Sequence, residues 1–191
     1  MFRTVHQDSS DYLTNPLRTG ASVVKVKLSF YDIPTMTPGK IVVLMGSTKD
    51  FDFASRIGKF LQEEEFELKP EYFVASAHKT PERLLKKLEE LKGTCDQLVF
   101  VTVAGLSDAL SGVVAGNTNH PVIACPPDSE KFGWAKIFSS TITPQGVAVA
   151  YVPRPENAAL YAAKILGLFD KALEKNIANY MKRLKESVAP M

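Results

Sequence analysis

The feature that most limits how this chain can fold is a series of short apolar segments separated by helical patterns. Residues 41–45, 98–103 and 121–125 are almost entirely apolar. Runs of this kind are typical of strands that are buried on both faces of a parallel sheet. The intervening segments repeat leucine, isoleucine and phenylalanine at the spacing of an amphipathic helix. The alternation therefore predicts an α/β protein with an open, doubly wound parallel sheet.

Two further segments complete the expected strands. Residues 72–74 and 147–152 are rich in β-branched and aromatic residues and are interpreted as strands. The helical patterns lie between the strands and after the last of them, where the longest leaves open a break near Gly167. Helices are expected at 51–67, 81–93, 109–116, 135–140 and 157–188.

Length and composition narrow the class of protein. The 191 residues suffice for one well-buried domain. The 23 basic and 21 acidic residues give a formal net charge of +2 without a basic block, so no nucleic-acid partner is expected. The N-terminus lacks a signal-peptide pattern and no segment approaches the ~18 apolar residues of a membrane span, so we expect a cytoplasmic protein without membrane association. Cys95 and Cys125 lack metal-site spacing, and Cys125 is more readily a core residue than a nucleophile.

The two ends of the chain differ from its middle. Residues 1–22 are polar and lack a period, whereas residues 24–30 alternate like a half-exposed strand, either at the sheet edge or against another subunit. We divide the chain into an N-terminal extension (1–39), an α/β domain (40–155) and a C-terminal helix (156–191). The far half of that helix has no strand left to cover. We expect it to pack on a neighbouring subunit, with a solvated tail as the alternative.

Three loops of small and polar residues, 46–50, 76–80 and 104–108, each follow an expected strand. In a parallel α/β sheet such loops meet at the carboxyl edge, where ligands bind. His78 lies in the second loop and is the strongest acid/base candidate near neutral pH, although a loop histidine can also be an ordinary polar residue. The loops therefore predict one pocket, with His78 as its candidate catalytic group.

The chemistry of these loops suits a small phosphorylated ribosyl compound. Ser47 and the backbone N–H groups at the start of the following helix suit a phosphate, but an ordinary helix cap by residue 47, 48 or 50 explains them equally well. Asp50 suits ribose hydroxyl groups, and Lys79 suits an anion. His78 would then transfer a proton to or from the ligand.

The loop sequences also resemble those of a known family. Seven segments, in unbroken order over about residues 40–183, are similar to the aminoimidazole ribonucleotide (AIR) carboxylase family of purine biosynthesis. They are Gly-Ser-Thr-Lys-Asp at 46–50, Ser-Ala-His-Lys-Thr-Pro at 76–81, Ala-Gly at 104–105 with Ser107, Pro-Val-Ile-Ala-Cys-Pro-Pro at 121–127, Ser-Ser at 139–140, Pro-Gln-Gly at 144–146 and Glu-Asn-Ala-Ala at 156–159. The lysine after His78, the Asn-Thr before His120 and the Cys-Pro-Pro are closer to the class that uses CO2 directly than to the N5-carboxy-AIR (N5-CAIR) mutase class.

The resemblance implies a flavodoxin-like three-layer sandwich, a homo-octamer and a reaction without biotin, ATP, metal or other cofactor. The implied reaction is the reversible carboxylation of AIR by CO2 to 4-carboxy-AIR (CAIR), with His78 as the proton shuttle. Ser47 and Lys79 would contact phosphate or carboxylate, and Asp50 would contact ribose. The other implied substrate-binding residues are Gly46, Ser76, Ala77, Ala104, Gly105 and Ser107.

Two positions depart from the family pattern. The CO2-using class usually has Ala-Gly-Arg-Ser-Asn where this chain has Leu106 and Asp108. Losing an arginine and gaining a carboxylate should weaken anion binding at this loop, unless Lys49, a serine in the usual motif, compensates. Two alternatives to the carboxylase stay open: an N5-CAIR mutase, and a ribotide-binding protein with an altered substrate or no activity.

Overall fold

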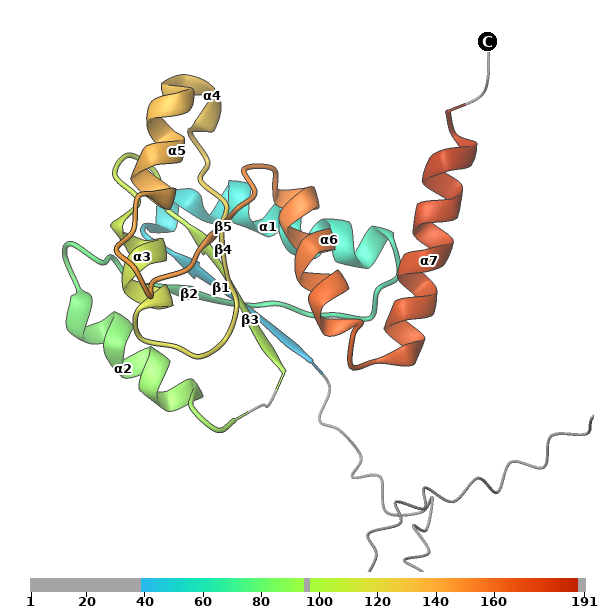
Figure 1. The fold of residues 1–191 in the computed structure, drawn as a ribbon, viewed down its shortest axis with the longest axis horizontal. Helices are drawn as coiled ribbons and strands as arrows, with labels where there is room; N and C mark the ends of the chain where they lie inside the picture. The colour runs from blue at the N-terminus through green and yellow to red at the C-terminus, as the bar shows by residue number, and fades with distance from the viewer. Residues whose placement is uncertain (1–38, 95–96, 189–191) are drawn as a thin grey trace, which may run out of the picture. The chain divides into compact units, whose positions relative to one another are not determined.

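A computed structural model describes residues 39–94 and 97–188 (Figure 1). The expected strand at 24–30 and Cys95 lie outside these residues. Within them the sheet has the parallel strand order β2-β1-β3-β4-β5, which confirms the doubly wound α/β fold. The strands are β1 (Lys40–Met45), β2 (Glu71–Val74), β3 (Leu98–Val103), β4 (Val122–Ala124) and β5 (Ala150–Tyr151). The helices are a 3-10 turn η1 (Thr48–Asp50), α1 (Phe51–Glu63), α2 (Pro81–Leu91), α3 (Ala109–Ala115), α4 (Ser129–Phe132), α5 (Trp134–Thr141), α6 (Pro155–Leu166) and α7 (Lys171–Glu186).

The central strands β1 and β3 account for the apolar runs at 41–45 and 98–103. Every residue of β3 is buried, as is every residue of β1 after Lys40. The two strands pair along their full length, with Met45 opposite Val103 at the carboxyl end. Strand β2 is added on one side of β1, and β3, β4 and β5 are added in turn on its other side. The direction in which strands are added therefore reverses between β1 and β3. A switch point of this kind is where open α/β sheets bind ligands.

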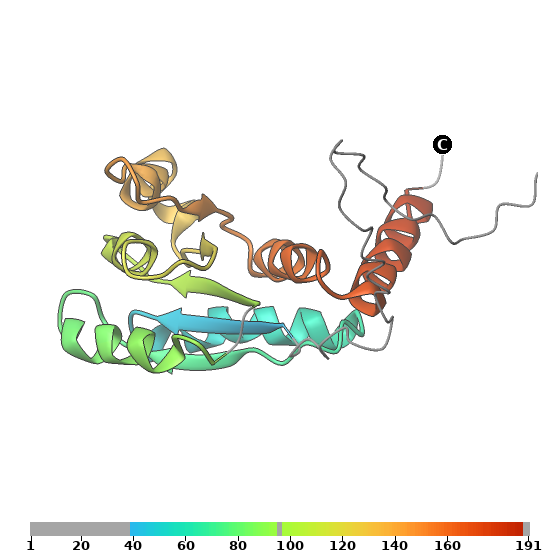
Figure 2. The ribbon, with the colours of Figure 1, turned by 60° about the horizontal axis from the view of Figure 1, so that its bottom comes forward.

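Helices cover both faces of the sheet, which completes the expected three layers (Figures 1 and 2). Alternate residues of β1 and β3 point to opposite faces and bury apolar side chains on each. On one face the core contains α1 and α6, through Ala54, Ile57, Leu61, Ala158, Ala159, Ala162, Ala163 and Leu166. On the other face it contains α2 and α3, through Leu84, Leu88, Leu91, Leu110 and Val114.

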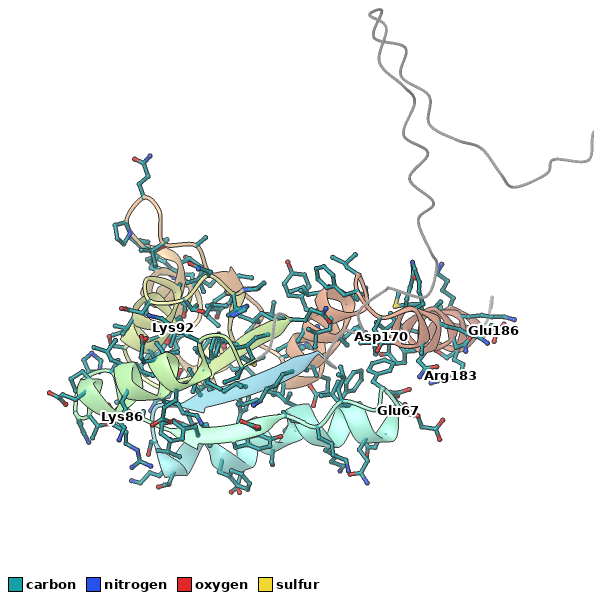
Figure 3. The ribbon with its side chains drawn as sticks, turned by 90° about the horizontal axis from the view of Figure 1, so that it is seen from below. Glu67, Lys86, Lys92, Asp170, Arg183 and Glu186 are labelled. Carbon is teal, nitrogen blue, oxygen red and sulfur yellow. The ribbon has the colours of Figure 1, made fainter. Side chains whose placement is uncertain are left out.

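The C-terminal segment forms two helices where the sequence suggested one long helix. Helix α6 ends at Leu166, close to the break considered at Gly167, and α7 begins at Lys171. Asp170 (Figure 3) caps α7, because its Oδ1 accepts hydrogen bonds from the backbone N–H groups of Ala172 and Leu173 at 2.9 and 3.1 Å. The capping carboxylate therefore fixes where α7 begins.

Helix α7 has packing partners within the described part of the chain, although it covers no strand. Leu173 and Ile177 are buried against the core that holds α1 and α6. The Tyr180 ring lies edge-on to Phe60 and Phe66, each at 5.7 Å between ring centroids. Helix α7 is thus part of the domain as far as Tyr180. A contact of its second half with a neighbouring subunit stays a proposal.

The region after β4 differs most from the sequence-based expectation. Helix α4 was not expected, and β5 contains only two of the six residues predicted at 147–152. Strand β5 is an edge strand whose neighbour β4 has three residues, so a longer β5 would find no partner for its ladder hydrogen bonds. Among the described helices, none is both long and apolar enough to cross a bilayer.

Candidate active site

The loops after β1, β2 and β3 enclose a pocket of about 550 Å³ at the carboxyl edge of the sheet. All ten residues that the sequence predicted for the site line it: Gly46, Ser47, Asp50, Ser76, Ala77, His78, Lys79, Ala104, Gly105 and Ser107. Lys49, Leu106 and Leu110 complete the wall. A larger hollow of about 800 Å³ lies between the end of α1, residues 64–70 and α7, and it contains no histidine. The smaller pocket is therefore the candidate active site, because it combines the switch point with an acid/base group.

The loop after β1 is held at both ends by backbone hydrogen bonds. The N–H of Gly46 donates to the Val103 carbonyl at 2.9 Å, and the N–H of Asp50 donates to the Ser47 carbonyl at 3.1 Å. The Ser47 Oγ accepts from the N–H of Lys49 at 3.2 Å and so caps the short turn η1. The cap interpretation of Ser47 is therefore correct, and the same residue also faces the pocket.

The loop that carries His78 is closed by a small hydrogen-bonded ring. The Thr80 Oγ1 accepts from the N–H of Ser76 at 2.9 Å, and the N–H of Thr80 donates to the Ser76 carbonyl at 2.9 Å. The Ser76 Oγ accepts from the N–H of Lys79 at 3.2 Å. The Thr80 hydroxyl is engaged in this ring and does not cap α2 through its side chain, although Thr80 occupies the cap position. The exposed imidazole of His78 therefore projects from a loop with little conformational freedom.

The loop after β3 contains a strained residue. Leu106 has φ of 57°, in the left-handed region that side chains with a Cβ rarely adopt, and its side chain is 72% exposed. Apolar packing therefore does not hold it. Its N–H donates to Asp128 Oδ2 at 2.6 Å, and its carbonyl accepts from the Lys136 ammonium. Polar contacts from outside the loop fix this conformation.

Asp108 does not carry the charge into the pocket that the sequence suggested. It is 2% exposed and caps α3, and it is absent from the pocket wall. Its carboxylate accepts hydrogen bonds from the N–H of Ser111 at 3.2 Å, from the Ser111 hydroxyl and from the Ser140 hydroxyl at 2.7 Å. The start of α3 and two hydroxyl groups thus stabilise this negative charge. The expectation that Asp108 weakens anion binding has no support from its position.

Sequence reasoning missed a cation behind the same loop. The ammonium of Lys136 donates to the Ala104 carbonyl at 3.0 Å and lies 3.0 Å from Asp128 Oδ1, and the lysine is 1% exposed. Helix α5 inverts the usual pattern of buried apolar and exposed polar side chains. Lys136 and Ser140 are buried, whereas the neighbouring Trp134 is 72% exposed. A lysine among apolar helix residues is normally read as solvated, so the sequence contained no usable signal for this contact.

Asp50 is the site carboxylate whose titration is most affected by its surroundings. Burial raises its pKa above the ordinary value, and the charge of Asp128 raises it further, whereas a backbone hydrogen bond at Ser47 and the ammonium of Lys136 lower it. A carboxyl group with a raised native pKa binds protons more tightly when folded. Folding is therefore less favourable once the pH rises through that pKa, so the ionised Asp50 is retained at a cost in stability. Within the described residues no cluster of three or more His, Cys, Asp or Glu could hold a metal ion.

The strand order and the pocket at the β1/β3 switch point define a flavodoxin-like α/β protein with a candidate ligand pocket at the carboxyl edge of the sheet. A family model described as AIR carboxylase matches residues 40–187. The chain belongs to this family.

Individual relatives agree with this membership. A phosphoribosylaminoimidazole carboxylase from Archaeoglobus fulgidus is 44% identical over 149 residues, which cover 78% of this chain and 81% of that protein. An N5-carboxyaminoimidazole ribonucleotide mutase from Methanocaldococcus jannaschii is 39% identical over 150 residues, which cover 78% of this chain and 92% of that protein. The crystal structure of Treponema denticola PurE superposes with a TM-score of 0.74 at 37% identity and covers 78% of this chain and 94% of that one.

Proposed function

We propose that this protein catalyses the reversible carboxylation of AIR by CO2 to CAIR in purine biosynthesis. The observation that carries the proposal is the convergence in one pocket of His78, two lysines and Asp50 on loops held by backbone hydrogen bonds. The family and its relatives support the coarser statement, AIR carboxylase or N5-CAIR mutase activity. The use of CO2 as the source of the carboxyl group and the role of His78 are proposals beyond what the family and its relatives support.

The chemistry requires little more than these groups supply. C4 of the aminoimidazole ring is nucleophilic through its enamine-like amino group, and it forms a bond to the carbon of CO2. The resulting tetrahedral C4 still carries its hydrogen, and removal of that proton returns the electron pair to the ring and completes CAIR. A histidine whose proton exchanges near neutral pH suits this step in both directions, and nearby cations favour the developing carboxylate. No step needs an added cofactor.

Each pocket residue has a proposed role in this reaction. Ser47 and Lys79 contact the phosphate or the carboxylate, and Asp50 accepts hydrogen bonds from the ribose hydroxyl groups. Their positions around one cavity of about 550 Å³ support these roles, since a ribotide fits a cavity of this size. The remaining residues exclude water and shape the wall: Gly46, Ser76, Ala77, Ala104, Gly105 and Ser107.

The experiment that tests the proposal is turnover of purified protein with AIR and bicarbonate alone, together with the reverse decarboxylation of CAIR. We expect both reactions without N5-CAIR. Turnover of N5-CAIR only would identify the mutase instead. Binding of AIR or CAIR without any turnover would identify a ribotide-binding protein, the alternative that the missing arginine at position 106 raised.

The proposed assembly is a homo-octamer in the cytoplasm, with the second half of α7 on a neighbouring subunit. In support, the C-terminal end exposes apolar side chains: Leu184 is 46% and Val188 is 77% exposed in the single chain. Apolar side chains at a helix end favour association with another surface. The proposed segments are an extension at 1–39, an α/β segment at 40–155 and a C-terminal segment at 156–191, whose helices α6 and α7 share the core of the α/β segment.

Lys49 is expected to contribute an anion contact at the position where the family usually has serine. Replacing it in Lys49→Ala should raise the KM for CAIR about tenfold with little change in kcat, because a charge-assisted hydrogen bond to the bound substrate is lost. The matched control is Lys86→Ala, since Lys86 (Figure 3) is an exposed lysine of α2 outside the pocket. Equal KM values for the two variants would show that Lys49 does not take over the arginine's role.

A further inference from the structure

The back of the pocket wall is held by two charged residues that do not line the pocket. Lys136 of α5 reaches residues 104–106 from behind, with three partners for its ammonium: the Ala104 carbonyl, the Leu106 carbonyl and Asp128 Oδ1. The two carbonyl groups accept hydrogen bonds from the ammonium, and the contact with Asp128 Oδ1 is an ion pair at 3.0 Å. Asp128 in turn accepts from the N–H of Leu106. We call these two residues the Lys136–Asp128 clamp.

The clamp holds a conformation that the loop would not adopt by itself. Leu106 has a positive φ, and its side chain is 72% exposed, so burial of that side chain does little to offset the strain. Strained residues persist only where the surroundings over-determine them. The clamp engages both the N–H and the carbonyl of Leu106, so it directly restrains the peptide groups on either side of the strained residue.

The clamp also lies close to Asp50. A Cβ placed on Gly105 would be 3.5 Å from Asp128 Oδ2 and 3.8 Å from Asp50 Oδ1, so both carboxylates lie beside the space that a side chain at this position would occupy. The charges of Asp128 and Lys136 shift the pKa of Asp50 in opposite directions. Lys49, His78 and Lys79 are the other ionisable side chains that line the same pocket.

We propose that Lys136 and Asp128 are positioning residues of the active site, which hold residues 104–106 in place and balance the charge next to Asp50. This inference rests on the proposed function, because it assigns Asp50 to substrate binding. It also explains how the loop tolerates leucine at position 106, where the family pattern has arginine. The cation of this loop comes from α5, behind the wall, and orders the backbone without contacting the substrate.

The test combines single and double substitutions with two measurements. Lys136→Met, Asp128→Asn and the double variant are compared with Lys131→Met, which removes the same charge from an exposed position on α4. Hydrogen exchange of the segment 104–107 needs no turnover. The change in the pH dependence of KM for CAIR from one variant to another reports the change at Asp50, because the phosphate of the substrate and His78 are present in all of them.

In Lys136→Met we expect exchange in the segment 104–107 to become ~10-fold faster or more, since the Leu106 conformation loses its restraint. The pKa that governs KM should rise in Lys136→Met and fall in Asp128→Asn, each by ~0.5–1 unit, because one removes a positive and the other a negative neighbour of Asp50. The double variant should lie between the two. If the two residues had a purely structural role, the pKa that governs KM would shift in the same direction in all variants.

Several results would overturn the clamp. An unchanged rate of hydrogen exchange at 104–107 in Lys136→Met would contradict it. A shift of the pKa that governs KM in the same direction for both single variants would also contradict it. If Lys136→Met does not fold, Asp128→Asn must still lower the pKa that governs KM for CAIR. The double variant must then have a higher value of this pKa than Asp128→Asn. Failure of the proposed function is distinguishable, because a wild-type protein without turnover would still show slow exchange at 104–107 and its loss on substitution.

Discussion

Replacing His78 with asparagine is expected to lower kcat for the interconversion of AIR and CAIR by about 10²- to 10⁴-fold, the range typical of a lost general acid/base. Asparagine keeps a polar side chain of similar reach but cannot exchange a proton near neutral pH. The loop itself should persist, because its hydrogen bonds come from Ser76 and Thr80 rather than from the imidazole. The KM for CAIR should therefore change much less than kcat.

The chain offers a matched control for this substitution. His120 lies outside the pocket, near the Phe100 ring at 6.4 Å between ring centroids, so His120→Asn makes the same chemical change at another site. We expect near wild-type turnover for this control. Retention of most of the activity in His78→Asn would assign the proton transfer to another group and remove the main support for the proposed mechanism.

Replacing Asp108 with alanine is expected to destabilise the fold by about 2–4 kcal/mol. The substitution removes the cap of α3 and leaves the hydroxyl groups of Ser111 and Ser140 without their carboxylate partner. Both serines are almost fully buried, at 0% and 1% exposure, so water cannot replace the lost acceptor. For a domain of this size the loss corresponds to a fall in Tm of roughly 5–15 °C.

Two further variants separate the effect of burying the carboxylate from the effect of capping the helix. Asp170→Ala removes an exposed cap, that of α7, and should cost only ~1 kcal/mol. Asp108→Asn keeps one acceptor oxygen and should be much milder than Asp108→Ala. Thermal unfolding of the three variants provides the measurement. The interpretation of Asp108 as a buried structural cap would fail if Asp108→Ala cost no more than Asp170→Ala.

The sequence was sufficient to predict the layer architecture and the composition of the pocket. Apolar runs such as 41–45 and 98–103 can be stable only where both faces are covered, so they indicated a parallel sheet with helices on each side. Parallel strands bring their following loops to one edge, and this rule brought 46–50, 76–80 and 104–108 together without any knowledge of distances. The roles of the individual residues in this pocket stay predictions.

The same reasoning was insufficient where a side chain's partner lies far along the chain. Asp108 was expected to act as a free charge, but it bonds to Ser140 on α5. The far part of the C-terminal helical pattern was expected to have no strand left to cover, but Tyr180 of α7 packs against the rings of Phe60 and Phe66. Periodicity shows which face of a helix is apolar, and not which distant surface receives it.

The sequence by itself determined the parallel sheet, the edge of the sheet that holds the candidate pocket and the histidine at that edge, because hydrophobic period and chain direction are local properties. Only the tertiary structure decided the charge balance around the pocket. Lys136 and Asp128 approach the loop at 104–106 from about thirty and twenty residues further along the chain, and an ion pair between them forms only after α4 and α5 have packed. Electrostatic energy depends on the distance between charges and on their burial, and the order of residues in the sequence gives neither for residues far apart in the chain.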